Sequence, residues 1–131
     1  MDTSYPPQEG DTYRYERTFT HGDVEQFSEV TGDDQAIHSE PDEEGRLVVQ
    51  GLLTASLQTK IGGDLSVLAR AMEFYFRRPV YTGETIHCEW VTDSVEERED
   101  RYDIEVAVEC ARERDDETVL TAEVTGIIWK Q

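Results

Sequence analysis

Lysine is nearly missing from this sequence, and the basic residues are too few to balance the acidic ones. Lys60 and Lys130 are the only lysines, and 12 basic residues face 30 acidic ones, for a net charge of −18. Such a charge repels phosphate backbones, so we expect no nucleic-acid partner. Acidic residues spread along the whole chain are typical of a protein from a high-salt cytoplasm, where salt screens self-repulsion. An ordinary acidic protein is the alternative.

Cysteine and long apolar runs are also scarce. Cys88 and Cys110 are the only cysteines, too few for a disulfide framework or a zinc site, and we expect both to be buried free thiols. His21 and His87 have no acidic or cysteine partner at ligand spacing along the chain, so we interpret both as structural or surface residues. No apolar stretch can span a bilayer and no signal peptide opens the chain, which predicts a soluble cytoplasmic protein without a membrane partner.

The length and the hydrophobic pattern predict a single α+β domain over residues 1–131, with 1–11 as a loose lead-in. Apolar and polar residues alternate over 12–19, which predicts a first strand. Thr20 is a good N-cap for a short amphipathic helix, and Gly32 is a good terminator for it.

The second half of the sequence predicts one buried helix followed by an antiparallel sheet. After a polar loop over 33–46, apolar residues recur every four positions over 49–61, and we expect Gly62 and Gly63 to end this helix. Four segments then alternate between apolar and polar residues: 72–76, 86–90, 102–110 and 120–129. An apolar helix against a half-buried sheet is a two-layer α+β arrangement in which the sheet wraps the helix.

A carboxylate and an imidazole lie five positions apart in the polar loop. Asp33 follows the expected end of the first helix, and His38 completes the stretch TGDDQAIH. Together these groups form a competent acid/base pair near neutral pH, because each can accept or supply a proton. The alternative is an Asp that caps backbone groups and a His exposed to solvent.

Two further elements have residues that suit an acyl thioester ligand. Gly51 opens the buried helix, where a backbone amide without an intrahelical acceptor can stabilise a developing oxyanion. Close packing of helix against sheet is the alternative reason for a glycine there. Arg77 and Arg78 form a double arginine that can bind phosphate or can pair with neighbouring carboxylates.

These segments resemble the MaoC-like hydratase/dehydratase family of hotdog proteins, which includes the monofunctional (R)-specific enoyl-CoA hydratases. The resemblance covers roughly residues 12–129: TGDDQAIH is similar to the family's Asp/His signature, VQGLLTASL to its helix-opening glycine, and FRRPVYTGE to the pattern F-x-x-PV-x-x-G-[DE]. The family usually has Asn-Pro where this chain has Gln35-Ala36, and His where it has Gln50.

The resemblance implies a hotdog fold, with an antiparallel sheet wrapped around a long buried helix, and the interconversion of trans-2-enoyl and 3-hydroxyacyl thioesters. Asp33 and His38 would hold one water, the Gly51 amide would polarise the thioester carbonyl, and Thr59 would lie near the water. No metal or redox cofactor is expected. A very acidic surface disfavours an acidic carrier protein, so we expect an acyl-CoA substrate. Arg77, Arg78 and Lys60 are the candidate contacts for its phosphates.

Two other functions are compatible with the same resemblance. The hotdog fold also hosts acyl-CoA thioesterases, in which Asp33 would act at the thioester carbonyl. A non-catalytic module that binds acyl thioesters is the second alternative. Because hotdog domains commonly associate, the resemblance also implies a homodimer or a higher homo-oligomer.

Overall fold

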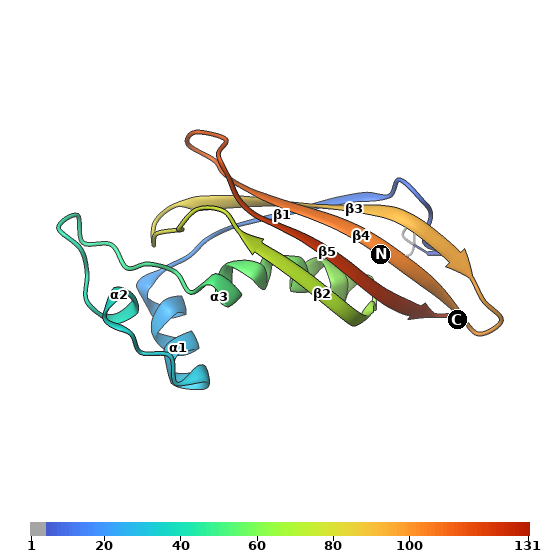
Figure 1. Cartoon of the computed structure of the whole chain (residues 1–131), viewed down its shortest axis with the longest axis horizontal. Coiled ribbons are helices and arrows are strands. Elements are labelled where there is room, and N and C mark those ends of the chain that lie inside the picture. The colour runs from blue at the N-terminus through green and yellow to red at the C-terminus, as the bar shows by residue number, and fades with distance from the viewer. Residues whose placement is uncertain (1–4) are drawn as a thin grey trace.

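A five-stranded antiparallel sheet forms one layer of the molecule, and the helices cover one of its faces. The computed structural model describes residues 5–131. The strands are β1 (Thr12–Thr18), β2 (Leu68–Phe76), β3 (Thr85–Glu97), β4 (Arg101–Arg112) and β5 (Thr118–Trp129), in the spatial order β1-β3-β4-β5-β2. Figure 1 shows that the helices lie on the same side of this sheet. The predicted α+β hotdog fold is therefore confirmed.

The first helix begins and ends where its capping residues predict. Helix α1 (His21–Thr31) starts with a capping box, in which the Thr20 hydroxyl accepts from Asp23 N and the Asp23 carboxylate accepts from Thr20 N. It ends at Gly32, whose φ of 80° is in the left-handed region that glycine tolerates best. Because the helix ends at Gly32, Asp33 is the first residue of the loop that follows α1.

The expected helix over 49–61 is correct in position but is divided into two segments. Helix α3 (Gly51–Ala55) and helix α4 (Leu57–Asp64) meet at Ser56, whose hydroxyl donates to Leu53 O at 2.5 Å. A serine hydroxyl that bonds back to a carbonyl of the preceding turn competes with the regular helical pattern, and this break is its result.

Gly62 was expected to end this helix, but α4 continues past it to Asp64. An added Cβ at Gly62 would lie 3.4 Å from the Trp90 ring. The glycine therefore lets α4 approach the sheet closely.

The core lies between α4 and the inner face of the three central strands. Trp90 is 1% exposed, and Leu57 and Ile61 of α4 are also buried. Complete burial of a leucine or isoleucine side chain contributes about 1.5–3 kcal/mol each. Both cysteines are buried and free, as expected. No helix within residues 5–131 has both the length and the apolar composition that a membrane crossing requires.

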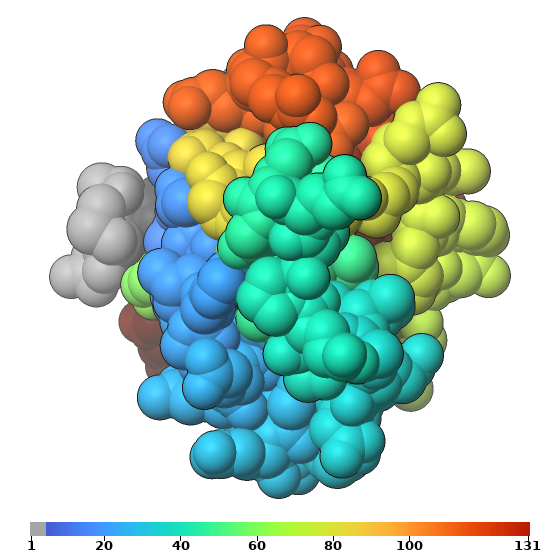
Figure 2. Space-filling view, turned by 90° about the vertical axis from the view of Figure 1, so that its left-hand side faces the viewer, coloured from blue at the N-terminus to red at the C-terminus, as the bar shows by residue number. Residues whose placement is uncertain are grey.

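The loop between α1 and α3 is tied to the turn between β2 and β3. This loop contains one short helix, α2 (Ala36–Ser39), which the sequence pattern did not predict. Val49 N donates to Val80 O at 2.8 Å, and Thr82 N donates to Leu47 O at 2.9 Å. Figure 2 shows α1 and the segment that contains α2 side by side over one end of the molecule. The loop that contains Asp33 and His38 is therefore held against the turn that follows Arg77 and Arg78.

Candidate active site

Asp33 and His38 face each other across a short gap. The His38 Nε2 atom lies 3.7 Å from the nearer Asp33 carboxylate oxygen, Oδ2. A single water about 2.8–3.0 Å from each atom fits this separation, since those are ordinary hydrogen-bond lengths. The His38 side chain is only 6% exposed, whereas that of Asp33 is 37% exposed. The pair therefore combines a fixed ring with a carboxylate that solvent or a ligand can reach.

The backbone fixes the tautomer of His38. Its Nδ1 atom lies 2.7 Å from Val48 O, and because a carbonyl oxygen only accepts, Nδ1 must carry a proton and donate. In the neutral ring this leaves a lone pair on Nε2, the atom that faces Asp33. Burial and this bond together hold the imidazole in one orientation, as an acid/base group requires.

Gln35, which stands where the family usually has asparagine, forms a hydrogen bond with Asp33. Its Nε2 donates to Asp33 Oδ1 at 2.8 Å, which leaves Oδ2 facing His38. Asp33 thus accepts from a side chain rather than capping backbone groups, and His38 is buried rather than exposed to solvent. The alternative interpretation of both residues is wrong on these contacts.

One cavity of about 430 Å³ brings together residues from the three predicted segments. This volume lies in the range of small-molecule sites, roughly 300–1,000 Å³. Apolar side chains form much of its wall, and polar or charged side chains complete it. Its lining includes Asp33, Gln35, Ile37, His38, Val48, Val49, Gly51, Thr54, Phe76, Arg77, Arg78, Pro79, Val80 and Val119.

Gly51 lies at the start of α3 and against an aromatic ring. As the first residue of that helix its amide has no intrahelical acceptor. An added Cβ would lie 2.9 Å from Cε1 of Phe76, so close packing also favours glycine here. Both interpretations of Gly51 from the sequence therefore have support. It lines the cavity, where its amide can contact a ligand, and it allows α3 to pack closely against β2.

The two arginines differ in whether a carboxylate neutralises them. Arg78 Nε pairs with Glu117 Oε1 at 3.0 Å, as the alternative interpretation of the double arginine predicted. Arg77 donates to the Thr121 hydroxyl at 3.0 and 3.2 Å and has no carboxylate within ion-pair distance in residues 5–131. Arg77 is therefore the better placed of the two to bind an anion.

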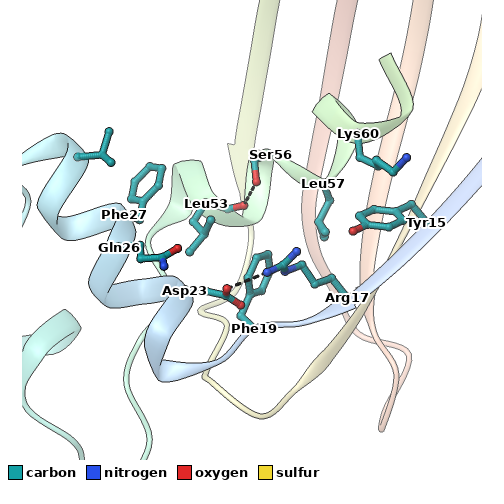
Figure 3. Close-up of a pocket in the computed structure, with 11 residues that line it drawn as sticks. Tyr15, Arg17, Phe19, Asp23, Gln26, Phe27, Leu53, Ser56, Leu57 and Lys60 are labelled. Carbon is teal, nitrogen blue, oxygen red and sulfur yellow. Dashed lines mark hydrogen bonds and ion pairs between the residues drawn. The ribbon is translucent and has the colours of Figure 1, made fainter. Parts of the chain in front are cut away.

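Lys60 and Thr59 do not line this cavity. Lys60 pairs with Asp64 at 2.8 Å and borders a second cavity of about 450 Å³ between β1, α1 and α4. Figure 3 shows that cavity, with Lys60 and Tyr15 on one side and Phe27 of α1 on the other. Thr59 is exposed, and its hydroxyl accepts from the Gln58 side chain at 3.1 Å. Within residues 5–131, neither residue joins the group formed by Asp33, His38 and Arg77.

Gln50, the second departure, links α1 to α3. It is 2% exposed, and its Nε2 donates to Val24 O at 3.1 Å and to Ser28 Oγ at 2.9 Å. Its Oε1 atom is buried without a partner in the described residues. The sequence pattern did not predict this contact, because it depends on how two separate helices pack. These bonds hold Gln50, the residue that precedes Gly51, against α1.

Three potential metal ligands lie on the outer face of the sheet, and the sequence did not predict them. Glu16 and His87 are opposite each other on β1 and β3, and Glu113 lies 3.1 Å from His87 Nε2. The three ligand atoms are within 4.8 Å of one another, and all three residues are exposed. His87 is a surface residue, as expected, but it has two acidic neighbours that spacing along the chain does not show: Glu16, through the pairing of β1 with β3, and Glu113, just beyond the end of β4. None of the three lines the cavity of Asp33 and His38.

Comparison with known proteins identifies the family. A family model described as the MaoC like domain matches residues 3–113, most of the chain. The chain belongs to the MaoC-like family. Among curated proteins, this MaoC-like chain is 27% identical over 130 residues to the mitochondrial 3-hydroxyacyl-[acyl-carrier-protein] dehydratase of Arabidopsis thaliana, covering 91% of this chain and 76% of that protein. The family is one of hydratases and dehydratases.

Solved structures of other proteins have the same fold. Protein af1124 of Archaeoglobus fulgidus is 28% identical, with a TM-score of 0.78, covering 93% of this chain and 79% of that one. The (R)-hydratase of A. caviae involved in PHA biosynthesis is 21% identical, with a TM-score of 0.81, covering 93% of this chain and 97% of that one. At that identity the likeness to the A. caviae protein shows the shared fold alone.

Proposed function

We propose that this protein is a hydratase/dehydratase that interconverts trans-2-enoyl and 3-hydroxyacyl thioesters, with coenzyme A as the carrier. The observation that carries the proposal is the pairing of Asp33 with a His38 ring whose Nδ1 is bound to Val48 O. It leaves one carboxylate oxygen and one ring nitrogen directed at a volume that one water can fill. The family supports the reaction class.

In the hydration direction, Asp33 and His38 hold the attacking water between them. One of the pair removes a proton as the water oxygen bonds to C3, and a proton is delivered to C2. As enolate character develops, the amide of Gly51 donates to the thioester oxygen, a contact of a kind worth about 2.7–4 kcal/mol. Gln35 positions Asp33 through its 2.8 Å bond. The reaction as written needs no metal or redox cofactor.

Charge favours coenzyme A over an acidic carrier protein. The chain has a net charge of −18, so it would repel an acidic carrier protein wherever the salt is too dilute to screen the two charges. Arg77 lines the cavity and has no carboxylate partner in residues 5–131, which supports it as a phosphate contact. Arg78 and Lys60 are weaker candidates because Glu117 and Asp64 already pair with them.

We also propose that two copies associate through β2. Strand β2 is at the edge of the sheet, and an open edge with exposed apolar side chains favours pairing with another chain. Six exposed large apolar residues are on β2 or near it: Leu52, Leu68, Met72, Tyr75, Phe76 and Trp129. Because Phe76 also lines the cavity, a partner here would enclose the site. Light scattering that gives the mass of one chain would contradict this proposal.

The acidic surface and scarce lysine support a protein adapted to a high-salt cytoplasm. Dissolved salt would screen the repulsion among 30 acidic residues. We expect the melting temperature to rise steeply from dilute buffer to molar potassium chloride. A melting temperature that is independent of salt would favour an ordinary acidic protein.

One assay separates the proposed reaction from its two alternatives. Purified protein is mixed with crotonyl-CoA in concentrated potassium chloride, and the loss of enoyl absorbance and the release of free thiol are followed together. Hydration predicts loss of absorbance, formation of 3-hydroxybutyryl-CoA and no thiol. Steady thiol release would identify a thioesterase, and binding without turnover a non-catalytic module; either result would overturn the proposal.

A further inference from the structure

The two thiols of this chain are direct neighbours in the sheet. Cys88 of β3 and Cys110 of β4 are opposite each other in the register of these adjacent strands, which Figure 1 shows side by side. Both are free and each is 1% exposed, so both side chains point into the core. Side chains directly opposite on one face have Cβ atoms about 4.5–5.5 Å apart. The proposed hydration uses neither cysteine.

The hydrogen-bond pattern of the β3–β4 ladder shows which of two kinds of residue pair Cys88 and Cys110 form. In non-hydrogen-bonded pairs, opposite residues lie closer together than in hydrogen-bonded pairs. Glu113 N donates to Thr85 O at 2.9 Å, one position beyond the Ile86–Arg112 pair, so Thr85 and Glu113 form a hydrogen-bonded pair. The two types of pair alternate along an antiparallel ladder, so the Cys88–Cys110 pair, three positions further on, is non-hydrogen-bonded. The Cα atoms of such pairs are about 4.5 Å apart. This separation is within the range of disulfides, about 4.4–6.8 Å.

We propose that Cys88 and Cys110 form an oxidation site, at which a reversible intramolecular disulfide joins β3 to β4. The oxidant is a small-molecule disulfide, such as oxidised glutathione. The thiolate of one cysteine attacks the sulfur–sulfur bond of the oxidant, forms a mixed disulfide and releases one reduced glutathione. The second cysteine attacks the protein sulfur of the mixed disulfide and releases another reduced glutathione, so two electrons and two thiol protons pass to the oxidant.

The environment of the pair makes this exchange slow in the native state. Hydrogen bonding with Cys88 and burial both raise the pKa of the Cys110 thiol well above its ordinary value. Because the thiolate is the attacking form, oxidation follows transient opening of the β3–β4 ladder. The disulfide restricts the unfolded chain, and we expect it to lower the equilibrium constant for unfolding about 100-fold.

The test is oxidation of the full chain with glutathione disulfide, followed by a thiol count in denaturant. We expect two thiols per chain before oxidation and none after it, a mass lower by two hydrogen atoms, and complete reversal by dithiothreitol. Trypsin can cut after Arg98 and Arg101, between the two cysteines, so digestion yields two peptides joined by the disulfide. The oxidised chain is expected to unfold at a higher urea concentration than the reduced chain.

Matched variants show whether the effect needs both thiols. Cys88→Ala and Cys110→Ala should each keep one thiol or form a mixed disulfide, and neither should gain resistance to urea on oxidation. Two thiols that persist after a cycle of partial unfolding in oxidant, two glutathione adducts per chain, or only disulfides between chains would each overturn the proposal. Neither cysteine lines the Asp33–His38 cavity, so the thiol count is independent of any hydratase activity.

Discussion

Replacing Glu84, a buried member of an ion pair, with alanine should destabilise the fold far more than replacing a glutamate of an exposed ion pair. Glu84 accepts from Tyr81 N at 2.9 Å and pairs with Arg112 at 3.5 Å, and the Glu84 and Arg112 side chains are only 9% and 10% exposed. Loss of a charge-assisted hydrogen bond costs about 1.5–3 kcal/mol. Leaving buried Arg112 without this partner adds to the cost, partly offset by Asp115 at 3.2 Å. We expect a total of about 3 kcal/mol.

The matched control is Glu89→Ala. The Arg14–Glu89 ion pair is shorter, at 2.8 Å, but its side chains are 73% and 42% exposed, so its loss should cost about 0–1 kcal/mol. For a chain of this length, about 3 kcal/mol corresponds to a fall of roughly 10 °C in melting temperature. Circular dichroism melts of the wild type and the two variants measure the difference. Equal melting temperatures for the two variants would refute the reasoning that burial, rather than the N–O distance, determines how much each ion pair contributes to stability.

Three further predictions concern the helix cap and the cavity. Thr20→Ala removes half of a capping box and should lower the urea unfolding free energy by about 1 kcal/mol; no change would mean the cap is redundant. Gln35→Ala should lower the kcat for crotonyl-CoA about tenfold at similar KM, because Asp33 loses one hydrogen bond; an unchanged kcat would contradict this. Arg77→Ala should raise KM about tenfold and Arg78→Ala much less; equal effects would contradict the assignment of Arg77.

Local sequence signals predicted those parts of the fold that depend on neighbouring residues. The cap at Thr20 and the left-handed Gly32 depend on contacts within one helix, so residue types alone indicate them. The period of two in the strands follows from burial of one face of the sheet. The break at Ser56 was not predictable, because it depends on whether the hydroxyl bonds to Leu53 O or to solvent.

The site was predicted in its residue types but not in its contacts. The TGDDQAIH stretch identified Asp33 and His38, yet the bond from His38 to Val48 depends on how the loop folds back onto itself. The exposed cluster of Glu16, His87 and Glu113 was missed for a similar reason. Strands β1 and β3 are neighbours in space but are separated in sequence by the helices and β2, so spacing along the chain does not show that Glu16 faces His87.

The most direct measurement of the central claim is the hydration rate of crotonyl-CoA by Asp33→Asn and His38→Ala variants, each first shown to melt close to the wild-type temperature. If the two groups share the attacking water, each variant loses at least about 100-fold in kcat while its circular dichroism spectrum is unchanged. A folded variant of either residue that keeps most of the wild-type kcat would contradict the account.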